Sequence, residues 1–316
     1  MRVAVIGAGS IGGFLAAALA RSGLDVAVVA RGAHLDAIAR DGITLVSSDF
    51  GPFSARVAAS DDLAKLGSFD VLILTFKSHQ WPALLEQLAP FAHTATRVVT
   101  MQNGVPFWFV RTPPLRTVDP QGRIGALFDD AQVIGGVVHV SGHIVRPGCI
   151  HQSGGTRYVL GTTDGRPDAG LDALVAAMRG AGLQAELDTD VREKVWLKLV
   201  NNVGLNTVST LRELTIQAML SNPQTRGEVR ELMLEALAVG QALGVVREAD
   251  VDARLTYAQR LGDVRTSMLQ DALAGRPLEL DPIVGAVVEL AARLELPVPR
   301  LAAVYATLRE RYGSPS

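Results

Sequence analysis

The feature that most constrains this chain is a glycine triplet between an apolar strand and an apolar helix, close to the first residue. Residues 3–6 predict a short strand, residues 7–12 read Gly-Ala-Gly-Ser-Ile-Gly, and residues 14–20 predict a helix. This order is the fingerprint of a dinucleotide-binding βαβ unit, in which backbone N–H groups face a pyrophosphate. The alternative is a structural turn without a ligand. We interpret the loop as cofactor-binding through Gly7, Ala8, Gly9, Ser10, Ile11 and Gly12.

The end of the second predicted strand indicates which dinucleotide is bound. Enzymes that bind NAD place Asp or Glu there to hold the ribose 2′-hydroxyl. This chain has Arg31 instead, and the acid of this strand, Asp25, stands at its start. A guanidinium suits a 2′-phosphate, because the two form charge-assisted and often bidentate hydrogen bonds. We therefore expect NADP(H); the alternative for Arg31 is a solvated surface arginine.

The pattern of elements changes near residue 189. At 316 residues the chain is too long for one ordinary core, so two domains are expected. Up to residue 188, strands alternate with helices, which predicts a Rossmann-like α/β domain with a mostly parallel, doubly wound sheet. From residue 189 to 316 we predict an all-α domain with helices at 191–210, 223–243, 249–274, 281–294 and 300–311.

Composition excludes several classes of protein. The net charge of −2 provides no electrostatic reason to bind nucleic acid or an anionic membrane, and no apolar run is long enough to span a bilayer. The chain enters a strand at once, which leaves no room for a signal peptide. A single cysteine, Cys149, fits a reducing cytoplasm. No Cys or carboxylate cluster accompanies His139, His143 and His151, so we expect no metal site.

Two polar side chains follow later predicted strands of the sheet. Lys77 comes just after the strand at 69–75, and Asn103 just after the strand at 97–101. Ligands in such folds lie beyond the carboxyl ends of strands, so we expect both residues in the same crevice as the glycine loop. For Asn103 the alternative is an ordinary Asn-Gly turn. The irregular stretch at 105–123 is either a lid or substrate wall, or surface decoration.

A polar stripe interrupts the first helix of the second domain. Lys198, Asn202 and Asn206 are spaced by four residues and therefore share one face of a helix that is otherwise apolar almost all round. Burying an ammonium and two carboxamides is costly without partners. Either a structural network satisfies them, or they face a wet cleft and await a ligand; we favour the ligand.

A second cluster lies further along the chain. Thr266 and Ser267 open a helical segment that reaches Asp271, and a link then leads to Glu279 and Asp281. Asp281 precedes Pro282 and reads as a helix cap. Glu279 lies between two leucines, and we interpret it as an acceptor of hydrogen bonds from a ligand.

Together these segments resemble the ketopantoate reductase family, whose members are NADPH-dependent 2-oxo-acid reductases. The residues that carry the resemblance span about 280 positions: Gly7–Gly12, Thr75-Phe-Lys77, Asn103-Gly104, Trp196–Asn206, Thr266–Asp271 and Glu279-Leu-Asp281. The resemblance implies that Lys198 is the general acid. It also implies that Asn202, Asn206 and Ser267 bind substrate, and that Lys77, Asn103 and Glu279 surround the cofactor and the reacting centre.

The expected reaction is reduction of 2-dehydropantoate to pantoate, a step of pantothenate biosynthesis. Asn103 could orient the nicotinamide ribose or the substrate. Three departures from the family pattern concern substrate recognition: Val264 and Val284 stand where Asn is usual, and the 105–123 stretch looks like a subgroup feature. A paralogue that reduces another 2-oxo acid therefore remains an alternative.

Two further interpretations assign the chain to a different class of protein. An S-adenosylmethionine-dependent methyltransferase also uses a glycine-rich loop, but Arg31 and the all-helical second domain fit it poorly. A non-catalytic NADPH sensor would be favoured had Lys198 been lost, and it is present. By analogy we also expect a homodimer.

Overall fold

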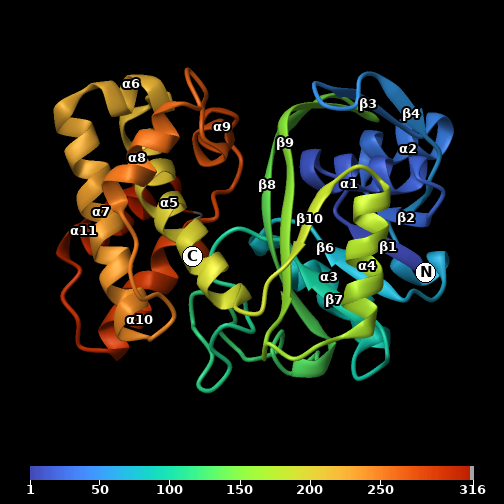
Figure 1. Ribbon diagram of the computed structural model, residues 1–316, viewed down its shortest axis with the longest axis horizontal. Coiled ribbons are helices and arrows are strands. Elements are labelled where there is room, and N and C mark those ends of the chain that lie inside the picture. Colours follow the sequence, from blue (N-terminus) through green and yellow to red (C-terminus); the bar gives the residue numbers. More distant parts are fainter. Residues whose placement is uncertain (314–316) are drawn as a thin grey trace. The chain divides into compact units, whose positions relative to one another are not determined.

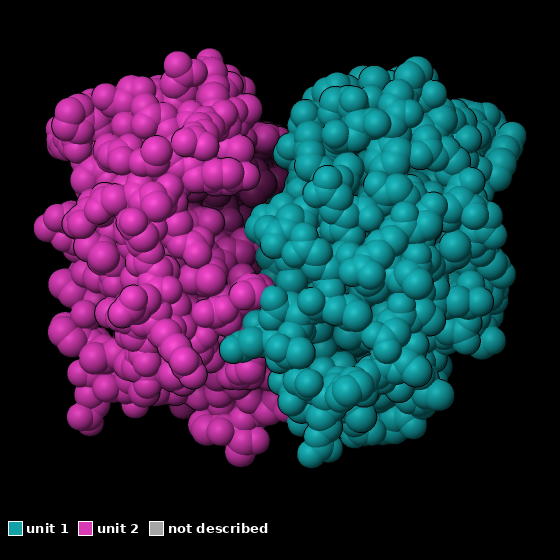
Figure 2. All heavy atoms as spheres, viewed as in Figure 1, with its two compact units in different colours: residues 1–102, 123–191 teal, residues 103–122, 192–316 magenta. Residues whose placement is uncertain are grey.

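The computed structural model describes residues 1–313, and the chain divides into two compact units (Figure 2). Unit 1 comprises Met1–Gln102 and Arg123–Val191, and unit 2 comprises Asn103–Gly122 and Arg192–Ser316. The domain limits at 1–188 and 189–316 stay a prediction, and residues 314–316 of the expected helical domain lie outside the described part. The segment Asn103–Gly122 of unit 2 is thus inserted between the two segments of unit 1 along the chain.

Unit 1 is built on a ten-stranded sheet (Figure 1). Its strands are β1 (Arg2–Ile6), β2 (Asp25–Val29), β3 (Ile43–Ser47), β4 (Phe53–Ala55), β5 (Ala58–Ser60), β6 (Val71–Leu74), β7 (Arg97–Thr100), β8 (Val133–Arg146), β9 (Cys149–Thr162) and β10 (Gln184–Leu187). They follow the order β4-β3-β9-β8-β7-β6-β1-β2-β5, and β10 also pairs with β9. The pairs β3–β4 and β8–β9 are antiparallel, and the other seven are parallel.

The carboxyl ends of the central parallel strands lie level at one edge of this sheet. Ile6 of β1 is in register with Val29 of β2 and with Leu74 of β6. Leu74 in turn pairs with Thr100 of β7. The segments that follow these strands therefore leave the sheet side by side, at the edge where ligands bind in open α/β folds.

Helices and short 3₁₀ turns complete unit 1. The helices are α1 (Ser10–Arg21), α2 (Gly32–Asp41), α3 (Trp81–Leu88) and α4 (Ala169–Gly180), and the turns are η1 (Leu63–Leu66), η2 (Ser78–Gln80), η3 (Ala89–Phe91) and η4 (Asp130–Gln132). Phe14 and Leu19 of α1 share one buried core with Leu174 and Met178 of α4. Burial of each such side chain stabilises the fold by roughly 1.5–3 kcal/mol. The Rossmann-like α/β class predicted from the sequence is confirmed.

Unit 2 is mainly helical, as predicted. Its helices are α5 (Val191–Arg212), α6 (Ile216–Ser221), α7 (Pro223–Ala242), α8 (Val251–Gln259), α9 (Ser267–Leu273), α10 (Ala286–Arg293) and α11 (Pro299–Tyr312), with a π-helical turn η5 (Asp281–Gly285) before α10. Trp196 of α5 is fully buried and donates its indole N–H to the Ala236 carbonyl of α7 at 3.0 Å. Within residues 1–313, none of the helices combines the length and apolar character that a bilayer crossing requires.

The irregular stretch after Asn103 is an integral part of unit 2. Phe109 stacks on Trp196 with ring centroids 5.5 Å apart and is buried. Glu289 of α10 accepts hydrogen bonds from the backbone N–H groups of Arg116 and Thr117 at 2.9 and 3.0 Å. The carbonyls of residues 113 and 114 accept from Arg293. Its buried aromatic side chains make this segment part of the core, so surface decoration is the wrong interpretation.

Three details of the predicted helices are wrong. The expected helix over 249–274 is two helices, α8 and α9, because Thr266 begins a new helix by accepting a hydrogen bond from the Leu269 N–H. Helix α6 was not predicted. Asp281 does not cap a helix with its side chain, since it lies inside η5 and accepts a hydrogen bond from the Tyr305 hydroxyl at 2.5 Å.

We expect Gly240→Ala to destabilise unit 2 by roughly 1–3 kcal/mol, because overpacking a core costs about this much. A Cβ at Gly240 would lie 2.1 Å from the Trp196 indole nitrogen, whereas a Cβ at Gly227 on the same helix would meet nothing within 4 Å. Gly227→Ala is therefore the matched control, and its higher helix propensity should leave stability equal or slightly raised. Chemical denaturation of both variants measures the difference; equal stabilities would contradict the packing argument.

Candidate functional site

The glycine loop turns sharply between β1 and α1. Gly7 has φ +103°, a conformation that side chains rarely adopt, and a Cβ there would lie 2.9 Å from the Phe76 backbone nitrogen. The N–H groups of Gly7 and Ala8 both donate to the Val29 carbonyl of β2, at 3.1 and 3.2 Å. The turn is therefore held by backbone bonds to the neighbouring strand.

The other two glycines of the triplet have different roles. A Cβ at Gly12 would lie 2.2 Å from the Gly7 carbonyl oxygen and 2.3 Å from Thr75 Oγ1, so this position brings α1 close to the end of β6. A Cβ at Gly9 would meet nothing within 4 Å. Gly9 is also the N-cap of α1 and provides no capping side chain. The first N–H groups of α1, at Ser10, Ile11 and Gly12, are thus left without a side-chain cap, as an anion site requires.

Arg31 and Lys77 lie at the same edge of the sheet as the loop. Arg31 follows β2 as the N-cap of α2, and its side chain is exposed and has no side-chain partner among residues 1–313. Lys77 follows β6, is half-buried, and its backbone N–H donates to Gln80 Oε1 at 3.0 Å. Because β1, β2 and β6 end level, unit 1 brings both cations to the loop's edge.

In unit 2, helix α5 carries the polar stripe. Lys198 and Asn202 are half-buried, and Asn206 is only 7% exposed. Burial lowers the pKa of Lys198 from 10.5 to about 8, and the nearby carboxylate of Glu279 opposes this shift. Glu279 is itself buried, 6% exposed. An ammonium with a pKa close to the working pH can donate a proton and can then be reprotonated by solvent.

Two backbone contacts show where the turn after Asn103 lies in unit 2. The Val105 N–H donates to the Pro282 carbonyl at 2.7 Å, and a Cβ at Gly104 would lie 2.5 Å from the same oxygen, so the turn after Asn103 packs against the chain that follows Glu279. Gly104 has φ +90°, which agrees with an Asn-Gly turn. A turn and a ligand-binding role are compatible, because the Asn103 side chain is half-buried and the two residues after it pack on Pro282.

Ser267 is the first residue of α9 and is exposed. Its neighbour Thr266 donates to Ser209 Oγ at 3.2 Å, and Ser209 lies one turn after Asn206 on α5. Ser267 is thereby held near the distal end of the stripe. The loop from α9 to Glu279 is fastened by Arg276, which donates to the buried carboxylate of Asp271 at 2.9 Å. Neither Arg276 nor Asp271 was predicted as a site residue, and their spacing of five carried no signal of this contact.

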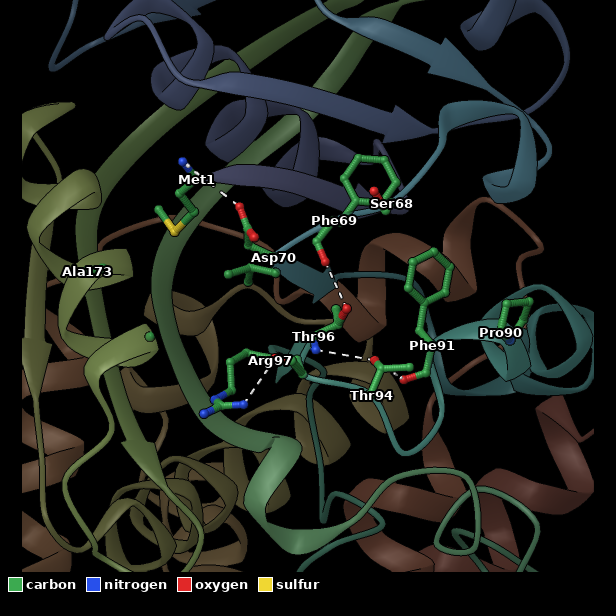
Figure 3. A pocket seen from close by; sticks show the side chains of 13 residues that line it. Met1, Ser68, Phe69, Asp70, Pro90, Phe91, Thr94, Thr96, Arg97 and Ala173 are labelled. Carbon is green, nitrogen blue, oxygen red and sulfur yellow. Dashed lines mark hydrogen bonds and ion pairs between the residues drawn. The ribbon is translucent and has the colours of Figure 1, made fainter.

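A cavity of unit 1 lies away from these residues. A cavity of about 610 Å³ is lined by Met1, Asp70 and Arg97, which stand at the beginnings of β1, β6 and β7 (Figure 3). It is therefore at the sheet edge opposite to the glycine loop. None of the predicted site residues lines it.

The side chains that commonly bind metal ions do not cluster in the described part of the chain. Among residues 1–313 no group of three His, Cys, Asp or Glu side chains could hold a metal ion. The rings of His143 and His151 lie 5.1 Å apart on adjacent strands, and Cys149 is buried with a free thiol.

Comparison with known proteins gives a consistent result. The family model described as "Ketopantoate reductase PanE/ApbA" matches residues 3–165, and that of its C-terminal part matches residues 190–312. A 2-dehydropantoate 2-reductase from Mesorhizobium japonicum is 40% identical over 317 residues, covering 98% of this chain and 97% of the relative.

Solved structures share the fold. The 2-dehydropantoate 2-reductase from Geobacter metallireducens has a TM-score of 0.89 at 28% identity and covers 98% of this chain and 100% of its own. A D-mandelate dehydrogenase with NADH and anilino(oxo)acetate has a TM-score of 0.86 at 18% identity, covering 99% and 98%, which shows the fold alone. Fold and similarities define an oxidoreductase with a Rossmann-like domain. The chain belongs to the ketopantoate reductase family.

We expect Glu279→Gln to lower the pKa of Lys198 below its value of about 8, because the carboxylate raises that pKa and the amide cannot. NMR titration of reductively ¹³C-methylated lysines would measure the shift. Glu310→Gln, an exposed carboxylate on α11, is the control and should leave the titration unchanged. A Lys198 pKa that stays constant or rises in Glu279→Gln would rule out this coupling.

Proposed function

We propose that this protein reduces a 2-oxo acid to a 2-hydroxy acid with NADPH, and that the substrate is 2-dehydropantoate, converted to pantoate in pantothenate biosynthesis. The observation that carries the proposal is the polar stripe of α5, on which Lys198 lies half-buried close to the buried carboxylate of Glu279. The extensive similarity to a 2-dehydropantoate 2-reductase supports the choice of substrate.

In this proposal the residues of unit 1 hold the cofactor, which supplies a hydride from nicotinamide C4 when bound. The uncapped N–H groups of residues 9–12 bind the pyrophosphate. Arg31 binds the 2′-phosphate, and Lys77 adds positive charge at the same edge of the sheet. From unit 2, Asn103 and Glu279 contribute to the surroundings of the cofactor and the reacting centre. The open space at Gly9 fits close approach of a ligand to the backbone.

The residues of unit 2 bind the oxo acid and donate the proton. Negative charge grows on the ketone oxygen as the carbonyl carbon is reduced, and the Lys198 ammonium donates a proton to that oxygen. The substrate's carboxylate and hydroxyl groups accept hydrogen bonds from amide and hydroxyl donors, which are those of Asn103, Asn202, Asn206 and Ser267. Glu279 keeps Lys198 protonated over a wider pH range by raising its pKa.

Oxidation of NADPH in the presence of single 2-oxo acids tests this function. We expect faster turnover with 2-dehydropantoate than with 2-oxoisovalerate and bulkier oxo acids.

Lys198→Ala should reduce kcat by about 10²–10⁴-fold, the usual contribution of a general acid, while NADPH binding remains. Lys194→Ala, which removes a lysine one turn earlier that pairs with Glu193 at 2.8 Å, is the matched control and should retain kcat.

The other outcomes identify the alternatives. Preference for a different oxo acid would indicate a paralogous reductase; Val264 is 44% exposed and Val284 is fully buried, so Val264 is the departure able to meet a ligand directly. Binding of NADPH without turnover of any oxo acid would favour a sensor. An unchanged kcat in Lys198→Ala would remove Lys198 from the mechanism.

Preference for NADPH over NADH is predicted to depend on Arg31. Charged hydrogen bonds contribute about 1.5–3 kcal/mol, so Arg31→Ala should raise the KM for NADPH roughly 10- to 150-fold and leave the KM for NADH nearly unchanged. Arg40→Ala, at an exposed arginine of the same helix, is the control. Equal KM changes for both cofactors would show that Arg31 does not contact the 2′-phosphate.

Two further proposals concern the state of the protein in the cell. The apolar helical unit leads us to propose a homodimer; a ketopantoate reductase from Staphylococcus aureus, 24% identical, is described as dimeric. The single cysteine supports a cytoplasmic location. The proposed partner is the small oxo acid alone, without nucleic acid or membrane.

A further inference from the structure

His34 of α2 uses both ring nitrogens to join the glycine loop to a distant turn of unit 1. Nε2 lies 2.7 Å from the Ala8 carbonyl oxygen, and Nδ1 lies 3.0 Å from the backbone nitrogen of Gly148. Gly148 stands in the turn between β8 and β9. His34 is half-buried and lies one turn after Arg31 along the chain.

Both contacts require the same form of the imidazole. The Gly148 N–H donates, so Nδ1 must be an unprotonated acceptor. The Ala8 carbonyl can only accept, so Nε2 must carry the proton and donate it. The ring is therefore the neutral Nε2–H tautomer, with a donor facing the glycine loop and an acceptor facing the hairpin turn.

The hairpin turn provides a rigid base for this ring. Gly148 has φ +74°, and a Cβ there would lie 2.9 Å from the Ala37 Cβ of α2, so backbone and helix are in close contact. The Gly148 carbonyl also accepts from the Thr44 N–H of β3 at 2.8 Å. The Nδ1 side of the His34 ring is thus held by the hairpin turn, while the Nε2 side contacts Ala8.

The hydrogen bond to Ala8 determines where the next N–H group points. The Ala8–Gly9 peptide is planar and trans, so its carbonyl and its N–H point in opposite directions. Holding the Ala8 carbonyl toward His34 turns the Gly9 N–H away from α2. That N–H has no acceptor in the described part of the chain, and Gly9 borders open space.

We propose that His34 is a positioning residue, which orients the Ala8–Gly9 peptide so that the Gly9 N–H is aimed at the pyrophosphate of the cofactor. This inference rests on the proposed function of the glycine loop. It adds a side chain from α2 to a loop that is otherwise held by backbone bonds to Val29 and by the Thr75 hydroxyl.

Two substitutions separate the two contacts of His34. The amide nitrogen of Gln reaches the position of Nε2 and can still donate to Ala8, whereas the amide oxygen of Asn reaches only the position of Nδ1 and can still accept from Gly148. We expect His34→Asn to weaken dinucleotide binding roughly 2- to 10-fold, the equivalent of one hydrogen bond, and His34→Gln to bind almost as wild type. In both variants kcat at saturating cofactor should be unchanged.

Isothermal titration calorimetry with NADP⁺ and NAD⁺ measures binding directly, without turnover. The comparison is made with whichever dinucleotide the wild type binds more tightly, since both contain the pyrophosphate. Hydrogen exchange of residues 7–12 in the free protein should be faster in His34→Asn than in His34→Gln, and thermal unfolding controls for loss of fold. Equal affinities of the two variants, or weaker binding by His34→Gln, would overturn the role of His34. Failure of the wild type to bind either dinucleotide would instead overturn the proposed function.

Discussion

The partly buried charge of Lys198 is the constraint on which the candidate site of unit 2 depends. Lys198 lies on a helix whose other faces are filled by side chains such as Trp196 and Leu199, and burial of its ammonium is unfavourable. Glu279 compensates in part, and its segment is in turn fastened by the Arg276–Asp271 contact and by the packing of Pro282 on Gly104. These contacts hold the segment that carries Glu279. The remaining cost is visible as the lowered pKa of Lys198, which is the property that a proton donor needs.

The candidate site of unit 1 follows a different principle, because its glycine loop is made mainly of backbone groups. Level strand ends bring the glycine loop, Arg31 and Lys77 to one edge of the sheet, and Gly7 and Gly12 allow contacts that a Cβ would prevent. Side chains act here mainly by fixing peptide orientations. Thr75 donates to the Gly7 carbonyl at 2.8 Å, and His34 contacts that of Ala8. Both residues lie outside the glycine triplet, although the triplet depends on them.

Most regular elements could be predicted from periodicity and from glycine and proline positions, since these are local properties. The strand expected at 3–6 and the helix expected at 14–20 correspond to β1 (Arg2–Ile6) and α1 (Ser10–Arg21). The prediction of helix boundaries and caps was wrong where contacts between distant residues determine the local structure. Thr266 begins a new helix within a continuous helical pattern, supported by its contact with Ser209 on another helix. Asp281 has the sequence context of a cap, yet Tyr305 from α11 binds its carboxylate instead.

By itself the sequence determined the Rossmann-like class, the glycine loop and the polar stripe on α5, because strand-turn-helix order and spacing by four are encoded within short segments. Only the tertiary structure decided that the segment Asn103–Gly122 belongs with the helices, through Phe109 on Trp196 and Glu289 on Arg116. It likewise decided that Glu279 lies close to Lys198, and that His34 touches Ala8. These pairs are separated by 26 to more than 170 residues along the chain, and no local pattern records a contact that arises only when distant segments pack together.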